Sequence, residues 1–304
     1  MDKSLSLASK VSEQPRSSKK KITPLGVLGY VVKYSIILLL SVSFILPLYW
    51  MAMSALKIPE QVFQIPPIWF PVPARWVNYI EAWQVDEFSL FLFNTIFRYC
   101  IPVVIGTVVS NTLVAYSFGR LKWPGRDVLF AICLMTMMIP GQVTMVPVFI
   151  IFKHLGWVNS FKPLVIPSFF AGAYNIFLLR QFFRTIPEEL SDSARIDGAN
   201  EFQILAYVIL PLVKPALAVV ALFSFMGAWN DYMGPLIYIN QSKLFPISLG
   251  LASLSATLNQ VGIKGLAYPY LMAVSTIVTI PIILIFFFAQ RTVIEGIALS
   301  GMKG

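Results

Sequence analysis

The stretch ELSDSARIDGANEFQILAYVILP, residues 189–211, decides how the rest of the chain is interpreted. Between Glu188 and Glu201 the sequence carries five of the chain's fourteen acidic residues, and an Asp-Gly pair interrupts this acidic segment. The sequence on both sides is apolar over lengths that suit a lipid bilayer. Because clustered carboxylates are poorly suited to hydrocarbon, we expect this stretch to contact something other than lipid.

Local signals in this stretch predict two short helices joined by a turn. The first helix covers residues 187–196, with proline in its first turn and acidic side chains near its positively polarised end. These acidic residues are Glu188, Glu189 and Asp192. Asp197-Gly198 predicts the turn, because glycine adopts positive φ angles that other residues resist.

The second helix is expected to run from about Ala199 towards Leu210. Its apolar positions recur at helical spacing, and they are Phe202, Leu205 and Ile209. Pro211 and Pro215 are expected to end this helix and to lead into a membrane span.

Two helices and a glycine turn would form a compact elbow, a name we use for residues 187–211. Small residues near its tip would let another surface approach closely, and they are Ser193, Ala194, Gly198 and Ala199. Phe202 is expected to fill a pocket on that surface. The alternative is a pair of amphipathic helices that rest on lipid headgroups. Anionic headgroups would repel the acidic cluster, which favours docking on a protein.

The composition is typical of an integral membrane protein. Of the 304 residues, 57% are hydrophobic and 12% are charged, whereas soluble domains carry about 25% charged residues. The net charge of +9 does not indicate nucleic-acid binding, because six of the 23 basic residues precede the first apolar segment. Both cysteines lie in apolar segments, so neither a disulfide nor a metal site is expected.

Six apolar segments each approach the roughly 20 residues needed to cross a bilayer. They cover about residues 28–53, 94–117, 128–151, 164–182, 215–238 and 269–289. Lysine and arginine are concentrated before the first segment, after the second and after the fourth, and they recur in the C-terminal tail. Basic loops tend to stay in the cytoplasm, so this pattern predicts that both termini and the elbow are cytoplasmic.

The expected organisation has three parts. These are a disordered basic N-terminus over residues 1–24, a six-span domain over 25–290 and a cytoplasmic tail over 291–304. The predicted fold class is therefore an all-α integral membrane protein. The loop after the first span is dense in Pro and Trp, which suits the outer membrane–water interface.

The elbow resembles the EAA loop of ABC-importer permeases. The family pattern is E-A-A, then D-G-A, then an apolar helix that ends in L-P. Asp192-Ser193-Ala194 stands at the E-A-A position, Asp197-Gly198-Ala199 matches D-G-A, and ILPLVKP at 209–215 closes the motif. Asp for Glu and Ser for Ala are departures from the pattern, and they keep charge or size.

Further features resemble the carbohydrate-uptake branch, which includes the smaller membrane subunit of the maltose transporter. They are MIP at 138–140, WND at 229–231 and the ending QRTVIEGIALSGMKG from Gln290. The resemblance covers residues 25–304. It implies the ABC type I importer permease fold, with six transmembrane helices and cytoplasmic coupling helices between spans 4 and 5.

The resemblance also implies the partners. In that family the loop is a coupling helix that sits in a cleft of a cytoplasmic ATPase. The implied complex has a second permease subunit, two ATPase subunits and an extracytoplasmic solute-binding protein in a bacterial-type inner membrane. That binding protein would deliver a sugar, an oligosaccharide or a glycerol phosphate. The residues expected to contact the ATPase are Glu189, Asp192, Ser193, Ala194, Asp197, Gly198, Ala199, Phe202 and Pro211.

The chain has no phosphate-binding loop of the form G-x-x-x-x-G-K-[ST]. ATP and Mg²⁺ are therefore expected on a partner chain. We expect no catalytic residue, cofactor or metal ligand in this one.

Asp231 is the clearest ionisable residue deep in a predicted span. It lies about 24 Å from Pro215, from the ~1.5 Å rise per residue of a helix. Such carboxylates line a cavity or pair with another group. Together with Trp229 and Asn230 it offers an aromatic face and hydrogen-bonding groups that suit a hydroxyl-rich solute. The alternative is a structural hydrogen bond at a helix end or a subunit interface.

Two other classes of function compete with an ABC permease. An ion-coupled transporter or channel typically has several intramembrane acids and broken helices, whereas only Asp231 qualifies in this sequence. An intramembrane enzyme needs paired catalytic groups, and one such aspartate with a single loop histidine does not supply them. Neither class explains the acidic elbow.

Overall fold

The computed structural model describes residues 24–261 and 266–301. These residues form helices joined by turns and loops, and none of the described residues lies in a β-strand. The predicted all-α class is therefore confirmed. The chain divides into two compact units after Trp50. The first unit contains most of the first helix, and the second contains everything from Met51 onward.

The described helices follow in chain order, and two of them have π-helical geometry (η1, η3) and two 3₁₀ geometry (η2, η4). They are α1 (Pro24–Ala55), α2 (Pro59–Val62), α3 (Val77–Gln84), α4 (Phe88–Phe93), η1 (Asn94–Cys100), α5 (Ile101–Arg120), α6 (Arg126–Thr136), α7 (Gly141–His154), α8 (Lys162–Val165), η2 (Ile166–Phe170), α9 (Ala173–Thr185), α10 (Glu189–Ile196), α11 (Glu201–Gln203), η3 (Ile204–Ile209), α12 (Leu210–Leu212), α13 (Lys214–Asn230), α14 (Met233–Tyr238), η4 (Ser242–Leu244), α15 (Ile247–Val261) and α16 (Ala267–Gly301).

Four helical segments among the described residues are long and apolar enough to cross a membrane. They are Val27–Ala55, Phe88–Arg120, Lys162–Thr185 and Ala267–Gln290. Two bent helix pairs would bring the number to six if each pair is one span. The expected boundary at residue 291 falls inside α16, because that helix continues to Gly301.

The third expected segment, 128–151, consists of two helices rather than one. α6 and α7 meet at an angle of 97° across a short break. Pro140, in the break, has an extended backbone (ψ 131°). Proline also disfavours helical geometry in the residue before it, so the MIP motif explains the bend.

The fourth expected segment, 164–182, is interrupted as well. Ala171 has a positive φ of 58° between η2 and α9. Two polar side chains of α5 accept hydrogen bonds from the interrupted backbone: Ser110 Oγ from Ala171 N (3.1 Å) and Asn111 Oδ1 from Gly172 N (2.8 Å). Irregular backbone at membrane depth requires such partners, because lipid offers none.

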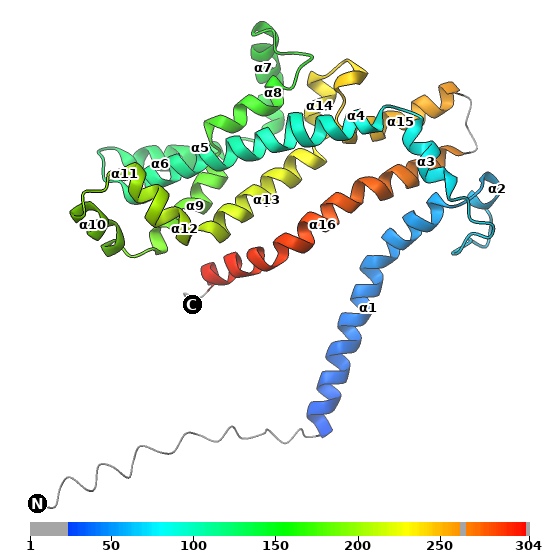
Figure 1. The fold of residues 1–304 in the computed structure, drawn as a ribbon, viewed down its shortest axis with the longest axis horizontal. Coiled ribbons are helices and arrows are strands. Elements are labelled where there is room, and N and C mark those ends of the chain that lie inside the picture. The colour runs from blue at the N-terminus through cyan, green and yellow to red at the C-terminus, as the bar shows by residue number, and fades with distance from the viewer. Residues whose placement is uncertain (1–23, 262–265, 302–304) are drawn as a thin grey trace, which may run out of the picture. The chain divides into compact units, whose positions relative to one another are not determined.

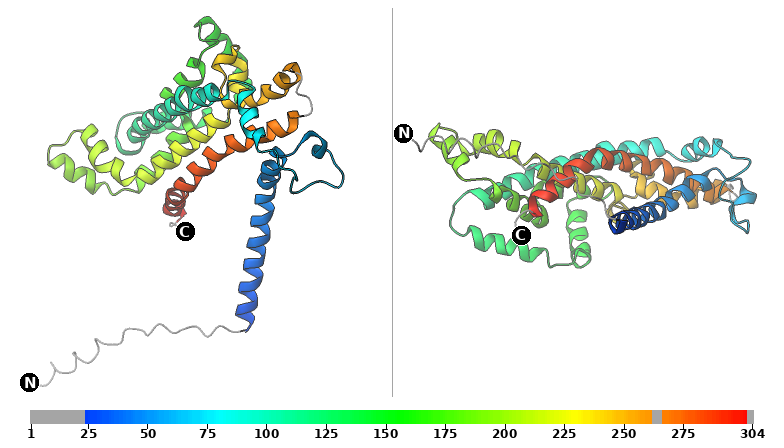
Figure 2. Two further views of the ribbon diagram at one scale, coloured as in Figure 1. Left: turned by 45° about the vertical axis from the view of Figure 1, so that its right-hand side comes forward. Right: turned by 90° about the horizontal axis from the view of Figure 1, so that it is seen from below.

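A bundle of long helices forms the second unit. α5 packs along α9 and α13, and α13 packs along α16; Figures 1 and 2 show α5, α13 and α16 side by side. A Cβ added to Gly119 would lie 3.3 Å from Phe183 Cβ, so α5 and α9 approach closely near their ends. The helices α10, α11 and α12 lie at this end of the bundle, and α3, α4 and α15 lie at the other (Figure 1).

Two clusters of buried apolar side chains stabilise the bundle, one towards each end. The first joins the η1 and α13 ends to α15 and α16, and it includes Phe88, Phe91, Tyr99, Trp229 and Leu254. The second lies beneath the elbow and includes Tyr116, Phe183, Ile204, Leu205 and Ile209. The elbow is therefore part of a packed core rather than a detached loop.

Candidate functional site

The first arm of the elbow is α10, and a glycine turn ends it. Gly198 has φ +85°, a conformation that glycine adopts at little cost. Its N–H donates to Arg195 O (3.0 Å), and Ala199 N–H donates to Ala194 O (2.9 Å). This pair of bonds is a Schellman motif, which satisfies the last carbonyls of the helix. The predicted turn at Asp197-Gly198 is confirmed.

The second arm begins two residues later than its expected start at Ala199. Asn200 caps it: its Oδ1 accepts from Gln203 N (3.0 Å), and Gln203 Oε1 accepts from Asn200 N (2.9 Å). This capping box fixes the direction in which the arm leaves the turn. The helix then widens to π geometry over Ile204–Ile209.

The second arm ends at Leu212, between Pro211 and Pro215 and two residues beyond the expected Leu210. The helix continues through Pro211 to Leu212, and the chain bends by 83° between the Glu201–Leu212 and Lys214–Asn230 segments. The π-helical turn before Pro211 explains why the helix continues through this residue. Proline lacks an N–H, and the wider turn accommodates its ring.

The apolar side chains of the second arm face the bundle, whereas the tip of the elbow is exposed. Ile204, Leu205 and Ile209 are buried against the second core cluster. The predicted contact residues Glu189, Asp192, Ser193, Asp197, Gly198, Phe202 and Pro211 are exposed, whereas Ala194 and Ala199 are half-buried. Two large apolar residues beside the Gly198 turn, which we call the tip, are exposed to solvent. Ile196 is 87% exposed and Phe202 is 76% exposed.

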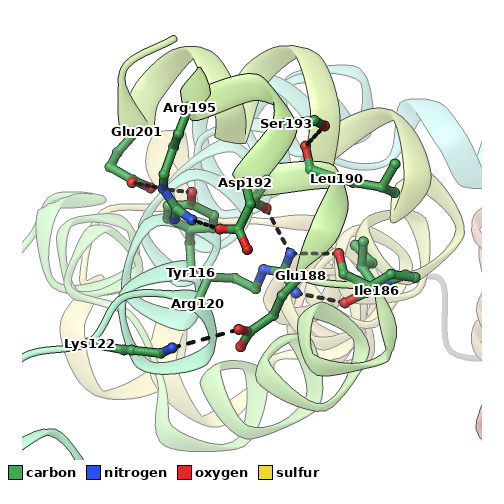
Figure 3. A network of polar contacts seen from close by, with 12 residues as sticks. Tyr116, Arg120, Lys122, Ile186, Glu188, Leu190, Asp192, Ser193, Arg195 and Glu201 are labelled. Carbon is green, nitrogen blue, oxygen red and sulfur yellow. Dashed lines mark hydrogen bonds and ion pairs between the residues drawn. The ribbon is translucent and has the colours of Figure 1, made fainter. Parts of the chain in front are cut away.

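Arg120, at the end of α5, ties the base of the elbow to the bundle (Figure 3). It is only 8% exposed. Its Nη1 donates to Ile186 O (2.7 Å) and more weakly to Phe183 O (3.4 Å). Its Nη2 donates to Pro187 O (3.1 Å) and to Ser191 Oγ (2.7 Å). One side chain therefore joins the end of α9, the linking residues and α10.

Tyr116, one helical turn before Arg120, ties the second arm to the same helix. Its hydroxyl donates to Glu201 Oε2 (2.7 Å), and Glu201 Oε1 accepts from Arg195 Nε (2.9 Å). Arg195 Nη1 also donates to Asp192 Oδ1 (2.7 Å). The hydrogen bond to Glu201 raises the pKa of Arg195 further, so this guanidinium stays charged. The two arms are thus joined to each other and to α5.

Neither Arg120 nor Tyr116 stands out in the sequence as a functional residue. Arg120 is one of the basic residues that follow the second apolar segment. The available signal was its position, an arginine directly after a long apolar helix and before the turn residues Trp123, Pro124 and Gly125. That signal alone does not specify a partner 66 residues away in sequence.

A second candidate region lies at the end of α13, around a cavity of about 570 Å³. Trp229 and Asn230 both line this cavity. The remaining lining residues come from α15 and α16 and the start of the link to α14, and include Tyr232, Ser248, Ser275 and Thr279. The cavity therefore combines aromatic and hydroxyl groups with aliphatic side chains, which make up half of its lining residues.

Asp231 is not among the residues that line the cavity. Its Oδ2 accepts from the Tyr99 hydroxyl (2.5 Å), and its Oδ1 accepts from Gly234 N (3.0 Å). Its backbone carbonyl accepts from Ser248 Oγ (2.6 Å). These bonds correspond to the structural alternative for Asp231, a helix-end contact beside the cavity. Within the described part of the chain, no group of three or more His, Cys, Asp or Glu residues is arranged to hold a metal ion.

Comparison with known proteins gives consistent matches. Residues 111–298 match the model of the family described as "Binding-protein-dependent transport system inner membrane component". The arabinooligosaccharides transport system permease protein AraQ of Halalkalibacterium halodurans is 32% identical over 67% of this chain and 71% of its own length. The polygalacturonan/rhamnogalacturonan transport system permease protein YtcP of Bacillus subtilis is 30% identical over 89% and 96%.

Two further similarities extend this set. The sn-glycerol-3-phosphate transport system permease protein UgpE of Yersinia enterocolitica is 29% identical over 86% of this chain and 94% of its own. A solved chain from a bacterial ABC transporter that imports the acidic polysaccharide alginate superposes with a TM-score of 0.79 and 24% identity. It covers 88% of this chain and 98% of that one, which shows the fold.

Proposed function

We propose that this chain, which belongs to the family of binding-protein-dependent transport system inner membrane components, carries a sugar or oligosaccharide inward as one permease of an ABC importer. Family membership makes the chain an inner-membrane transport component. The cargo class rests on the names of relatives, which include transporters of arabinooligosaccharides, of galacturonan polymers and of glycerol phosphate. All of these solutes carry hydroxyl groups.

The elbow is the observation that carries the proposed coupling mechanism. Its base is fixed to α5 by Arg120 and Tyr116, and its tip exposes Ile196 and Phe202. An exposed apolar tip on a rigid base is suited to docking in the cleft of another protein. We assign that cleft to a cytoplasmic ATPase, because this sequence has no phosphate-binding loop. Both termini and the elbow then lie in the cytoplasm.

The remaining partners follow from the same mechanism. A second permease would complete the membrane path, two ATPase subunits would bind ATP and Mg²⁺, and an extracytoplasmic protein would deliver the solute. Closure of the ATPase pair would move the elbow and shift the permeases between inward-open and outward-open states. Trp229 and Asn230 would contact the solute through stacking and hydrogen bonds.

Purification tests this assignment. A tagged chain extracted from native membranes in mild detergent should bring with it an ATP-hydrolysing subunit and a second permease, identified by mass spectrometry. The vanadate-sensitive ATPase activity of the preparation should rise when the solute-binding protein and its sugar are added. A purified chain that moves solute without a nucleotide-hydrolysing companion would contradict the proposal.

The replacement Asp231→Asn should lower uptake and leave the ATPase bound. Asn keeps the shape, with Oδ1 able to accept from Gly234 N and Nδ2 able to donate to the Tyr99 hydroxyl oxygen, but it removes the charge that strengthens the bond to Tyr99. Exchanging a charge-assisted hydrogen bond for a neutral one costs about 1 kcal/mol, which corresponds to a roughly fivefold effect. Uptake of labelled oligosaccharide into proteoliposomes measures the change, and co-purification measures the bound ATPase. If neither uptake nor assembly changes, the residue has no part in transport.

A further inference from the structure

We infer that Arg120 is the positioning residue that transmits movement of the elbow to the solute cavity, through the continuous helical segment Phe88–Arg120. This inference rests on the proposed function, since it assumes that an ATPase moves the elbow. The movement would pass through one side chain at each end of the segment, Arg120 at the elbow and Tyr99 at the cavity.

The hydrogen bonds of Arg120 fix the base of the elbow to α5. A guanidinium that is 8% exposed must be satisfied by hydrogen bonds, because an unpaired buried charge is costly. Its acceptors are the backbone carbonyls of Ile186 and Pro187, directly after α9, and the Ser191 hydroxyl of α10. The carboxyl end of a helix carries partial negative charge, which favours a cation at this place. α10 therefore cannot shift without displacing either Arg120 or the helix that carries it.

Tyr116 reinforces the same connection. It lies four residues before Arg120, so both side chains project from one face of α5. Tyr116 holds the second arm through Glu201, and Arg120 holds the first arm. Both arms are thus fixed to one helix, which makes the elbow and the end of α5 a single mechanical unit.

The other end of the same segment reaches the cavity. Tyr99 lies in η1, which continues directly into α5. Its hydroxyl donates to Asp231, the residue after Trp229 and Asn230, which line the cavity. Tyr99 and Arg120 are about 30 Å apart along the segment, from the ~1.5 Å rise per residue of a helix. A displacement at Arg120 is therefore delivered to the edge of the cavity.

A coupling assay without cargo tests this role. The probe is Ser275→Cys, a cavity-lining position, in a chain whose native Cys100 and Cys133 are replaced by alanine. The complete importer in nanodiscs is treated with a membrane-impermeant maleimide, with and without ATP and vanadate. In the otherwise unchanged chain, the modification rate should differ between the two conditions. ATPase retention and ATP hydrolysis are measured on the same samples.

The main variant is Arg120→Lys, which keeps the charge but cannot reproduce the planar, forked set of donors. It should retain and drive the ATPase, and the nucleotide-dependent change at Ser275→Cys should be lost. Tyr99→Phe, at the other end, should show the same loss. The matched control is Arg184→Lys, an exposed arginine in the last turn of α9, which should respond like the unchanged chain.

The outcomes separate the two claims. An unchanged chain that binds no ATPase would overturn the proposed function and this inference together. A normal response in Arg120→Lys, with the unchanged chain responsive, would overturn the inference alone. Release of the ATPase by Arg120→Lys would overturn it too, because Arg120 would then act in docking rather than in transmission.

Discussion

Replacing Gly198 with proline should abolish solute uptake while the chain still inserts into the membrane. Gly198 has φ +85°, whereas the proline ring holds φ near −65°. Proline would also remove the N–H that donates to Arg195 O. A proline in an incompatible conformation destabilises a turn by more than about 1 kcal/mol. The tip would leave its position at the ATPase, and uptake of labelled oligosaccharide should fall to the level of empty vesicles.

Gly156 provides a matched control for this change. It too has a positive φ, +66°, after a helix, and its N–H donates to Lys153 O in an equivalent turn. Gly156→Pro should disturb its own turn to a similar extent but retain uptake well above background, because this turn lies outside the elbow. Undiminished transport by Gly198→Pro, at normal membrane abundance, would exclude a rigid docking role for the elbow.

Replacing Phe202 with aspartate should release the ATPase subunit from the complex. Phe202 is 76% exposed in the first turn of the second arm, so its replacement should leave the fold of the chain intact. An aromatic anchor at the centre of an interface contributes at least about 2 kcal/mol, a roughly thirtyfold change in Kd. A buried carboxylate in its place would weaken binding further.

Titration of the purified ATPase onto the permease in nanodiscs measures this loss. Phe70→Asp is the comparison, because Phe70 is 67% exposed in the loop after the first helix and is not part of the elbow. It should bind the ATPase with unchanged affinity. Equal affinity of Phe202→Asp and the unmodified chain would show that Phe202 is not a contact residue.

The elbow could be predicted from the sequence because its signals are local. The Asp-Gly pair, the acidic first turn and the apolar spacing of the second arm act within a few residues of one another. The end of α10 at Ile196 and the Gly198 turn match the expectation, whereas α10 begins at Glu189, so Pro187 lies before the helix and not in its first turn. The second arm ends at Leu212, two residues beyond the expected Leu210, because a proline after a π-helical turn continues a helix that it would otherwise interrupt.

The connections between the elbow, α5 and the cavity could not be predicted in the same way. Arg120 reaches Ser191 across 71 residues, and Tyr99 reaches Asp231 across 132. Nothing in the local pattern of an apolar helix specifies such pairs. The sequence groups Asp231 with Trp229 and Asn230, which line the cavity, but it does not show that the Asp231 carboxylate bonds to Tyr99 beside that cavity.

The central claim, that the elbow docks on a cytoplasmic ATPase, is tested most directly by cross-linking from its exposed tip. Ser193→Cys, carrying a benzophenone maleimide, is irradiated in inside-out vesicles of cells that express the whole importer. We predict an adduct with the ATP-binding subunit, reduced when Phe202 is also replaced by aspartate. Modification of Ser193→Cys by an impermeant reagent in intact cells, or an adduct with lipid alone, would contradict the account.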